Sequence, residues 1–389
     1  MDTKSLLASL RGLTVYRDLL SEPVMECALR LVQSVADKKH DEGLAAYGEL
    51  FYQLARSGHD GLGSWLAEAL RRSESPYPLL AERSLHDDAL EQAARWDISV
   101  LQQLAEISCE HWLAELGNAS PSLPRWKSGA PFSFHSLTEA YVREGAGRFG
   151  LYRAFVWEDG SLIPVSRPDS PSADELLGYD RQRQEVIHNT RALLDGHYVN
   201  NILLYGESGT GKSATVKNLL TLPGMEELRI IEADKENLGG LPALIRSLDG
   251  RRQKFIVFID DLTFDRDDPT YSVLKTILEG GVERRPSNVA VYATSNRRHL
   301  VRQTISERAG DEMDRNETIR EKTSLADRFG VRILFEGLNK GDYLAIVDML
   351  AQRHGIGLPR EELHTRAVAG DRLHGSQTPR TALQFILSL

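Results

Sequence analysis

Eight consecutive residues, Gly206 to Ser213, have the composition and spacing of a loop that binds phosphate. They read Gly-Glu-Ser-Gly-Thr-Gly-Lys-Ser and fit the pattern GxxxxGK[ST]. The glycines allow the backbone to curl so that successive N–H groups point at phosphate oxygens, and a helix that begins there adds partial positive charge. In this pattern the lysine reaches the β- and γ-phosphates, and the final hydroxyl can ligate Mg²⁺. We therefore expect a triphosphate to be bound by Gly206, Glu207, Ser208, Gly209, Thr210, Gly211, Lys212 and Ser213.

The segments on either side of the loop support this interpretation. The apolar run NILLY (201–205) precedes it, and the helical pattern ATVKNLL (214–220) follows it. A glycine-rich turn that only happens to contain Lys-Ser would not need a strand before it and a helix after it.

A second candidate site is the apolar run Phe255 to Ile259, which ends in Asp260 and Asp261. A buried strand of this kind delivers carboxylates to its carboxyl edge, where ligands bind in open α/β sheets. We expect Asp260 to hold Mg²⁺, directly or through water, and Asp261 to orient and polarise an attacking water. A strand that simply ends in a solvated turn is the alternative, and the phosphate loop in the same chain disfavours it.

The spacing of apolar residues predicts the elements that position these motifs. Short apolar runs separated by helix-length segments predict a parallel sheet covered on both faces. These runs are NILLY (201–205), RIIEA (229–233), KFIVFID (254–260), NVAVYAT (288–294) and VRILF (331–335). Earlier and later segments have helical periodicity.

We therefore predict an α/β protein in four parts. These are a mainly helical N-terminal domain (1–149), a hairpin and linker (150–175), an α/β core (176–336) and a helical lid (337–389). In the second part, Asp159 and Gly160 stand between two alternating runs, a pattern typical of a two-residue hairpin turn with positive φ. The Pro- and Ser-rich stretch 166–175 reads as the linker and the main domain boundary.

Composition narrows the range of partners. The 389 residues carry a net charge of −9, and neither half has the basic excess of a protein that binds mainly through phosphates. No apolar run approaches the ~18 residues that span a bilayer, and the first residues lack a signal-peptide pattern. We expect a cytoplasmic protein with no membrane partner, in which Cys27 and Cys109 are buried free thiols.

In their order along the chain, these motifs resemble those of the AAA+ ATPases. The phosphate loop looks like Walker A, the strand ending in Asp260-Asp261 like Walker B, and Ala293-Thr294-Ser295-Asn296 like sensor 1. The segment SLADRFG (324–330) resembles the arginine-finger segment, and GSQTPRT (375–381) resembles sensor 2. The resemblance covers about residues 175–389, and the fold it implies is the P-loop NTPase sheet of an AAA+ core. More narrowly, GYDRQRQ, IDDLTF and YATSNRRHL are similar to an uncharacterised bacterial family of single-AAA+ ATP-binding proteins, a domain of unknown function.

The resemblance implies a role for several further residues. ATP with Mg²⁺ would be the ligand, and Asn296 would hydrogen-bond the attacking water or the γ-phosphate, unless it only caps its strand. Arg328 would reach the γ-phosphate of a neighbouring subunit, unless it pairs with the acids of 311–321. Arg380 would contact the nucleotide from the lid, unless it is a helix-surface arginine. Residues 178–180 (GYD) lie where family members pack near the adenine.

Two departures from the AAA+ pattern bear on activity. Asp261 stands where these proteins usually have Glu, which shortens the side chain by ~1.5 Å, and a misplacement of that size can cost on the order of 10²-fold in rate. The segment ADKENLGGLPALIRSL (233–248) carries no aromatic residue, which disfavours protein unfolding by an aromatic pore loop. A basic cluster is either a nucleic-acid surface or an intersubunit ion-pair surface facing the acids of 307–321. It comprises Arg284, Arg285, Arg297, Arg298 and His299.

The functional hypothesis is an ATP-hydrolysing AAA+ protein with active sites between the subunits of a homo-oligomer, in a ring or an open assembly. Hydrolysis would remodel an unidentified protein client bound through the N-terminal domain. One alternative is a slow-hydrolysing, nucleotide-gated assembly scaffold, and another is a DNA-linked loader ATPase. A nucleic-acid partner is not favoured by the charge.

Overall fold

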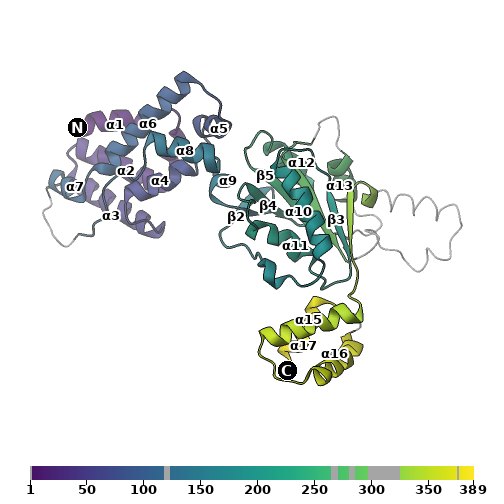
Figure 1. The fold of residues 1–389 in the computed structure, drawn as a ribbon. Helices are drawn as coiled ribbons and strands as arrows, with labels where there is room; N and C mark the ends of the chain where they lie inside the picture. Colours follow the sequence, from purple (N-terminus) through teal and green to yellow (C-terminus); the bar gives the residue numbers. More distant parts are fainter. Residues whose placement is uncertain (1, 118–122, 264–269, 280–284, 297–324, 375) are drawn as a thin grey trace. The chain divides into compact units, whose positions relative to one another are not determined.

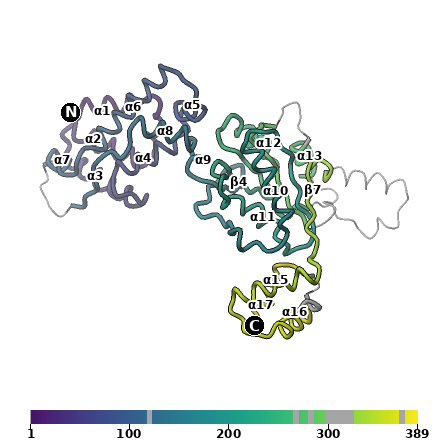
Figure 2. Tube along the Cα trace, viewed as in Figure 1, coloured from purple at the N-terminus to yellow at the C-terminus, as the bar shows by residue number. Residues whose placement is uncertain are grey.

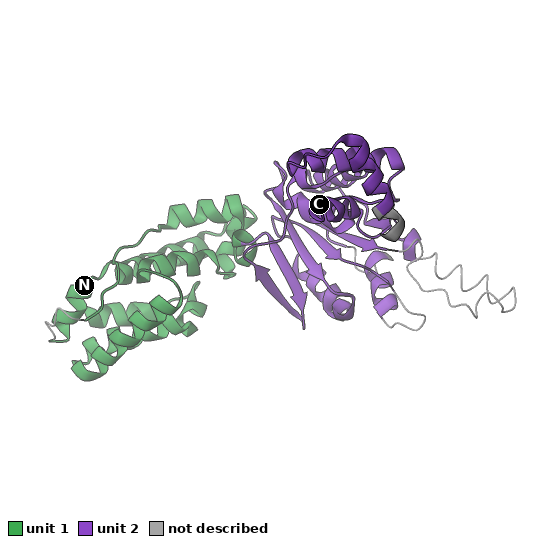
Figure 3. Ribbon diagram, turned by 90° about the horizontal axis from the view of Figure 1, so that it is seen from below, with its two compact units in different colours: residues 1–151 green, residues 152–389 purple. Residues whose placement is uncertain are grey.

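The computed structural model divides the chain into two compact units, Met1–Leu151 and Tyr152–Leu389 (Figures 1 and 3). It describes residues 2–117, 123–263, 270–279, 285–296, 325–374 and 376–389. Within these ranges, no helix combines the length and the apolar character that a membrane crossing requires. The two units are described in turn.

Unit 1 is built from helices that each bury one apolar face. In α2, for example, Val24, Ala28 and Leu31 recur at helical spacing and are at most 4% exposed. Cys27 and Cys109 are buried free thiols, as expected. The helices are α1 (Thr3–Arg11), α2 (Pro23–Ala36), α3 (His40–Arg56), α4 (Leu62–Arg71), α5 (Pro76–Glu82), α6 (Asp88–Glu106), α7 (Cys109–Glu115), α8 (Phe134–Glu144) and α9 (Arg148–Leu151).

A buried carboxylate ties the chain after α1 to the middle of α6. Asp97 is fully buried, and its Oδ2 accepts hydrogen bonds from the backbone N–H groups of Thr14 (3.0 Å), Val15 (2.8 Å) and Tyr16 (3.0 Å). A carboxylate can be buried in this way because several donors replace the water that it loses. Asp97 therefore holds three successive amides that no helix satisfies.

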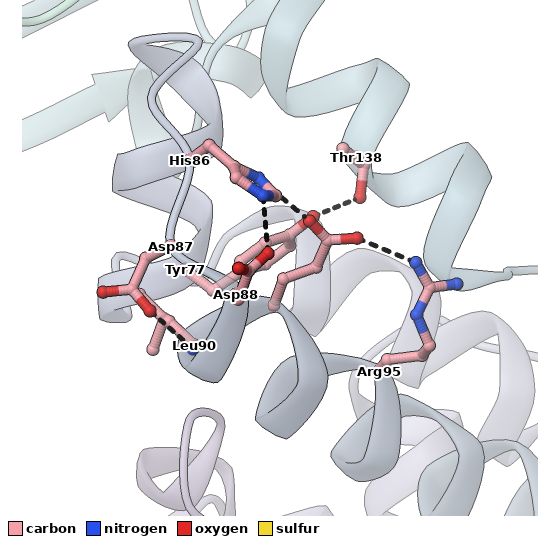
Figure 4. Close-up of polar contacts among 8 residues, drawn as sticks. Tyr77, His86, Asp87, Asp88, Leu90, Arg95 and Thr138 are labelled. Carbon is pink, nitrogen blue, oxygen red and sulfur yellow. Dashed lines mark hydrogen bonds and ion pairs between the residues drawn. The ribbon is translucent and has the colours of Figure 1, made fainter.

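Polar contacts also organise the start of α6 and the packing of α5 on α8 (Figure 4). The Asp87 side chain caps α6 by accepting from the N–H of Leu90 at 2.9 Å. Tyr77 of α5 and Thr138 of α8 share a hydrogen bond of 2.7 Å between their hydroxyls. His86 beside this cap is an exposed residue, so its contact with a carboxylate contributes little to stability.

Unit 2 contains one sheet whose strands run in the order β2-β1-β4-β5-β6-β3-β7. All described neighbouring pairs are parallel except β1 with β2. The strands are β1 (Ala154–Glu158), β2 (Ser161–Val165), β3 (Ile202–Gly206), β4 (Leu228–Ala233), β5 (Lys254–Ile259), β6 (Val289–Ser295) and β7 (Val331–Phe335). The helices of the core are α10 (Asp180–Leu194), α11 (Lys212–Asn218), α12 (Leu241–Ser247) and α13 (Thr270–Glu279).

Both faces of this sheet are buried, which is why its strands are continuous apolar runs. On one face Val186 of α10 and Val216 of α11 join Ile256 in a single hydrophobic cluster. Side chains that alternate with these along the strands, such as Val257 and Leu203, are also at most 1% exposed. The α/β fold class with a parallel sheet is confirmed.

The predicted hairpin is also confirmed, and the structure shows where it belongs. Asp159 and Gly160 have φ of 48° and 73° and join β1 to β2. Ala154 in β1 pairs with Ile230 in β4 in a parallel ladder, so the hairpin extends the sheet. The division between the units falls before it, between Leu151 and Tyr152, so both the hairpin and the stretch 166–175, which had been predicted as the main domain boundary, belong to unit 2. Register between distant strands is not visible in local sequence, which is why this pairing was not anticipated.

The last helices of unit 2 form a cluster with a hydrophobic core of its own, reached from β7 along the trace in Figure 2. Tyr343 and Val347 of α15 meet Leu363 of α16 and Ile386 of α17 in that core. The helices are α15 (Lys340–Arg353), α16 (Arg360–His374) and α17 (Pro379–Leu387).

Candidate functional site

The loop between β3 and α11 is curled, and its glycines make the curl possible. Gly206, Gly209 and Gly211 have φ of 134°, 80° and 89°, a region that other residues rarely adopt. A side chain at Gly206 would also place its Cβ only 2.1 Å from the carbonyl oxygen of Phe335. The loop is closed from inside by Thr210, whose hydroxyl donates to the carbonyl of Glu207 at 2.8 Å.

Lys212 holds a buried positive charge against this loop. It is 5% exposed, and its ammonium donates to the carbonyl oxygens of Glu207 (2.6 Å) and Gly206 (3.1 Å). Burial lowers the pKa of Lys212, and the nearby carboxylates of Asp260 and Asp261 oppose that shift. An anion in the loop would compensate the burial of the charge, which is the electrostatic requirement of a phosphate site.

Asp260 meets the loop because of the strand register. Ile259 pairs with Ala293 between β5 and β6, so the next residues, Asp260 and Thr294, lie side by side. Asp260 Oδ1 accepts from the hydroxyls of Ser213 (2.6 Å) and Thr294 (2.5 Å). The sheet thus places the carboxylate of the acid-ended strand directly on the last residue of the phosphate loop.

This oxygen pair fits Mg²⁺. The ion prefers oxygen ligands and is usually held by one or two carboxylates together with substrate phosphates and water. Ser213 and Asp260 supply one hydroxyl and one carboxylate at a mutual distance of 2.6 Å. Clusters of three or more His, Cys, Asp or Glu side chains that could hold a metal without a substrate are absent from the described ranges.

Asp261 and Asn296 are brought together at the same edge. The amide of Asn296 donates from Nδ2 to Asp261 Oδ1 at 2.8 Å. Asp261 has φ of 49°, and its N–H donates to the Thr294 hydroxyl at 2.9 Å. Thr294 was part of the sensor 1 pattern but had been given no role of its own. Because β6 also carries the hydroxyls of Tyr292 and Ser295, the sequence of the strand does not distinguish Thr294, and only its contact with Asp260 does.

A cavity of about 720 Å³ connects these groups, a size within the range of small-molecule sites. Its walls include residues 208–215 of the loop, Asp260 with Asp261, and Thr294 with Asn296. Residues 175–179, Arg183 of α10 and the C-terminal helices, through residues such as Arg353 and Arg380, also line it.

Two lining residues outside the sheet, Arg380 and Tyr179, are each held in place by a specific contact. The N–H of Arg380 donates to the carbonyl of Gly209 at 3.3 Å, which ties the start of α17 to the phosphate loop. Tyr179 has φ of 57°, and its ring packs 5.1 Å from that of Phe335. Burial raises the pKa of Tyr179 to about 12, so it stays a neutral hydrogen-bond donor.

Four of the residues expected near the nucleotide do not line the cavity: Asp180, Gly206, Glu207 and Arg328. The carbonyl oxygens of Gly206 and Glu207 instead accept hydrogen bonds from the Lys212 ammonium. Arg328 is exposed and lies just before β7, between the buried side chains of Leu325 and Phe329. Its side chain is thus displayed at the surface of its own chain.

The basic cluster is corrected at the one member that the structure describes. Arg285 points inward, donates to the carbonyl of Val199 at 2.6 Å and to Asn201 Oδ1, and lies 4.8 Å over the ring of Tyr198. Burial lowers its pKa. Arg285 is therefore engaged by residues of its own chain, which disfavours a role for it in reading phosphates. The other members, Arg284, Arg297, Arg298 and His299, and the acids of 307–321 lie outside the described residues.

The class of protein follows from the arrangement of these elements. The phosphate-loop strand β3 and the acid-ended strand β5 flank β6 in a parallel sheet, and a helical cluster follows the last strand. This arrangement is that of a P-loop NTPase sheet, and the motif order given above resembles that of the AAA+ ATPases. The chain belongs to the DUF815 family, described as proteins of unknown function, whose family model matches residues 150–389. No curated protein matches the sequence.

Among solved structures, the chain is similar to RuvB of Thermotoga maritima, a Holliday junction branch migration motor. The identity is 16% and the TM-score 0.36, over 56% of this chain and 63% of that chain. Two point-substituted forms of the same protein give TM-scores of 0.37 at 15% and 16% identity, over 56% of this chain and 63% and 64% of theirs. The chain thus spans less than two thirds of the RuvB chains that it matches.

Proposed function

We propose that the chain is an ATPase that binds ATP with Mg²⁺ in this cavity and hydrolyses it within an assembly of several copies. The observation that carries the proposal is the convergence of the phosphate loop and the acid-ended strand. Lys212 is buried among loop carbonyls, and Ser213 lies 2.6 Å from the Asp260 carboxylate in the same cavity as Asp261.

The residues divide the work by their chemistry. Lys212 and the loop amides bind the phosphates, while Ser213 and Asp260 would hold Mg²⁺. The bound ion neutralises charge on the phosphates and fixes their orientation. Asp261 positions the attacking water and accepts its proton, and Asn296 holds that carboxylate from the neighbouring strand.

Arg328 completes the site of a neighbouring copy in this proposal. It is exposed and does not line its own cavity, which suits a residue that acts across a subunit boundary. Arg380, anchored beside Gly209, would couple the angle of the lid (337–389) to the nucleotide. The helical domain (1–149) would then bind the protein client that the hydrolysis cycle remodels.

One observation favours a second candidate, a nucleotide-gated scaffold that assembles on ATP and hydrolyses it slowly. Asp261 is one methylene shorter than the usual glutamate, and one of its carboxylate oxygens is already engaged by Asn296. A DNA-linked loader is less well supported, because Arg285 of the basic cluster is turned into the fold.

The test is steady-state ATP hydrolysis measured over a range of protein concentrations. Lys212→Ala is expected to abolish nucleotide binding. Arg328→Ala is expected to bind ATP like wild type but to lose turnover, by about 10³-fold or more. Arg332→Ala, which removes another exposed arginine close by, is the matched control and should hydrolyse normally.

Mixing two inactive variants separates an action in trans from one in cis. Asp261→Asn and Arg328→Ala protomers are each inactive alone, but their mixture contains interfaces with both wild-type groups and should regain activity. Wild-type turnover in Arg328→Ala would refute the role in trans. ATP-dependent assembly with negligible wild-type turnover would replace the motor by the scaffold.

A further inference from the structure

We propose that Thr294 is a positioning residue that sets the direction of the Asp261 carboxylate by holding the backbone at Asp261 in a left-handed conformation. The inference deepens the proposed function and rests on it for the role of Asp261. The left-handed conformation of Asp261 does not depend on the proposed function, because the structure shows it directly.

Thr294 contacts three successive residues of the neighbouring chain segment. Its hydroxyl donates to Asp260 Oδ1 at 2.5 Å and accepts from the N–H of Asp261 at 2.9 Å. Its carbonyl oxygen accepts from the N–H of Leu262 at 2.7 Å. The hydroxyl therefore uses both its donor and its acceptor capacity, and it does so at 2% exposure, where water cannot substitute for it.

These contacts explain a local bend in the chain after β5. Two consecutive amides, those of Asp261 and Leu262, are received by the side chain and the backbone of the same residue, so the segment cannot continue as a regular strand. The backbone departs from strand geometry at Asp261, which has φ of 49°. Positive φ is unfavourable for most residues, and Asp is one of the few that tolerate it. Leu262 beyond it is fully buried and anchors the other end of the bend.

The bend determines where the shortened acid points. With the backbone turned in this way, Asp261 Oδ1 reaches Asn296 Nδ2 at 2.8 Å, on the wall of the cavity that holds the phosphate loop. The missing methylene is thus offset by backbone geometry, and the geometry depends on the Thr294 hydroxyl.

Replacing that hydroxyl by a methyl group tests this directly. In Thr294→Val the shape is kept, but the N–H of Asp261 retains only its 3.2 Å contact with Asp260 Oδ1. Asp260 also loses one of its hydroxyl donors. We expect Asp261 to relax from positive φ, which displaces its carboxylate by about 1 Å or more. A displacement of that size lowers the rate on the order of 10²-fold.

The matched control is Thr294→Ser, which keeps the hydroxyl and removes the methyl group. If Thr294 only fills the core, Thr294→Ser should lower kcat at least as much as Thr294→Val. If Thr294 positions Asp261, Thr294→Val should lower kcat more than Thr294→Ser. The measurements on the full chain are kcat and KM for MgATP, together with crystal structures of both variants without nucleotide.

The expected result is a drop in kcat of about 100-fold in Thr294→Val with KM within about threefold of wild type, and near-normal kcat in Thr294→Ser. In the crystal structures, φ of Asp261 stays positive in the serine variant and not in the valine variant. The inference is overturned if φ stays positive in both, or if both variants lose kcat equally. If wild type hydrolyses no ATP, the proposed function fails, and the two φ values still decide whether Thr294 holds the bend.

Discussion

Substituting Gly206 by alanine should destabilise unit 2 at the point where the phosphate loop leaves β3. Gly206 has φ of 134°, and a Cβ there would lie 2.1 Å from the carbonyl oxygen of Phe335, against an ordinary contact of at least 3.4 Å. That carbonyl also accepts a hydrogen bond from the N–H of Glu207 at 3.0 Å. The new methyl group must therefore push β7 away from β3 or rotate the loop.

The magnitude follows from two contributions. Forcing a non-glycine residue into this region of φ costs about 1–3 kcal/mol. Moving Phe335 by more than 1 Å breaks the Glu207 hydrogen bond, a loss of about 1 kcal/mol. Gly211 provides a matched control, because it has φ of 89° and nothing lies within 4 Å of its Cβ position. Gly211→Ala should cost only the strain, about 1–2 kcal/mol.

Native-state hydrogen exchange measures the difference locally, because the slowest amides of β3 and β7 report on the opening of the sheet in the intact chain. Gly206→Ala should destabilise these amides by about 2–4 kcal/mol, roughly 1–2 kcal/mol more than Gly211→Ala. That excess corresponds to about 5- to 30-fold faster exchange. Equal exchange in the two variants would refute the close approach of Gly206 to Phe335 on which the estimate depends.

Two further predictions concern charge. Burial lowers the pKa of Lys212, and phosphate oxygens would raise it again, so nucleotide binding should take up protons and affinity should fall as pH rises through the lowered pKa. Calorimetry in two buffers of different ionisation enthalpy checks this, and zero proton uptake at alkaline pH would contradict it. In unit 1, Asp97→Ala leaves three N–H groups without their acceptor, those of the buried Val15 and Tyr16 among them, and should cost about 3–5 kcal/mol in urea unfolding. Asp88→Ala, which removes a carboxylate that is 96% exposed, should cost under about 0.5 kcal/mol. Equal losses would show that the Asp97 contacts are dispensable.

Local patterns made much of the fold and site predictable. The phosphate loop is one short segment whose glycines, lysine and serine all act within a few residues of one another. The Asp159-Gly160 turn is equally local, since positive φ at two adjacent residues depends on those residues alone. Apolar runs predicted the strands, because a strand buried on both faces has no polar side.

Other features depend on which strands lie next to each other. The pairing of Ala154 with Ile230 made the hairpin part of the sheet, and no local pattern encodes that pairing. In sequence Arg285 resembles a surface arginine. In the structure its guanidinium donates hydrogen bonds to Val199 and Asn201, which lie more than eighty positions earlier in the chain. The role of Thr294 became visible only once β6 was placed beside β5.

By itself, then, the sequence determined that this chain contains a phosphate loop, an acid-ended strand and helices on both sides of them along the chain. These depend on the backbone preferences and polarity of neighbouring residues. The tertiary structure alone decided that Ser213 and Asp260 share a hydrogen bond, that Asn296 reaches Asp261, and that Thr294 bends the chain between them. Such contacts are set by the register of parallel strands, which must be brought together across long connections, and short stretches of sequence carry no record of that register.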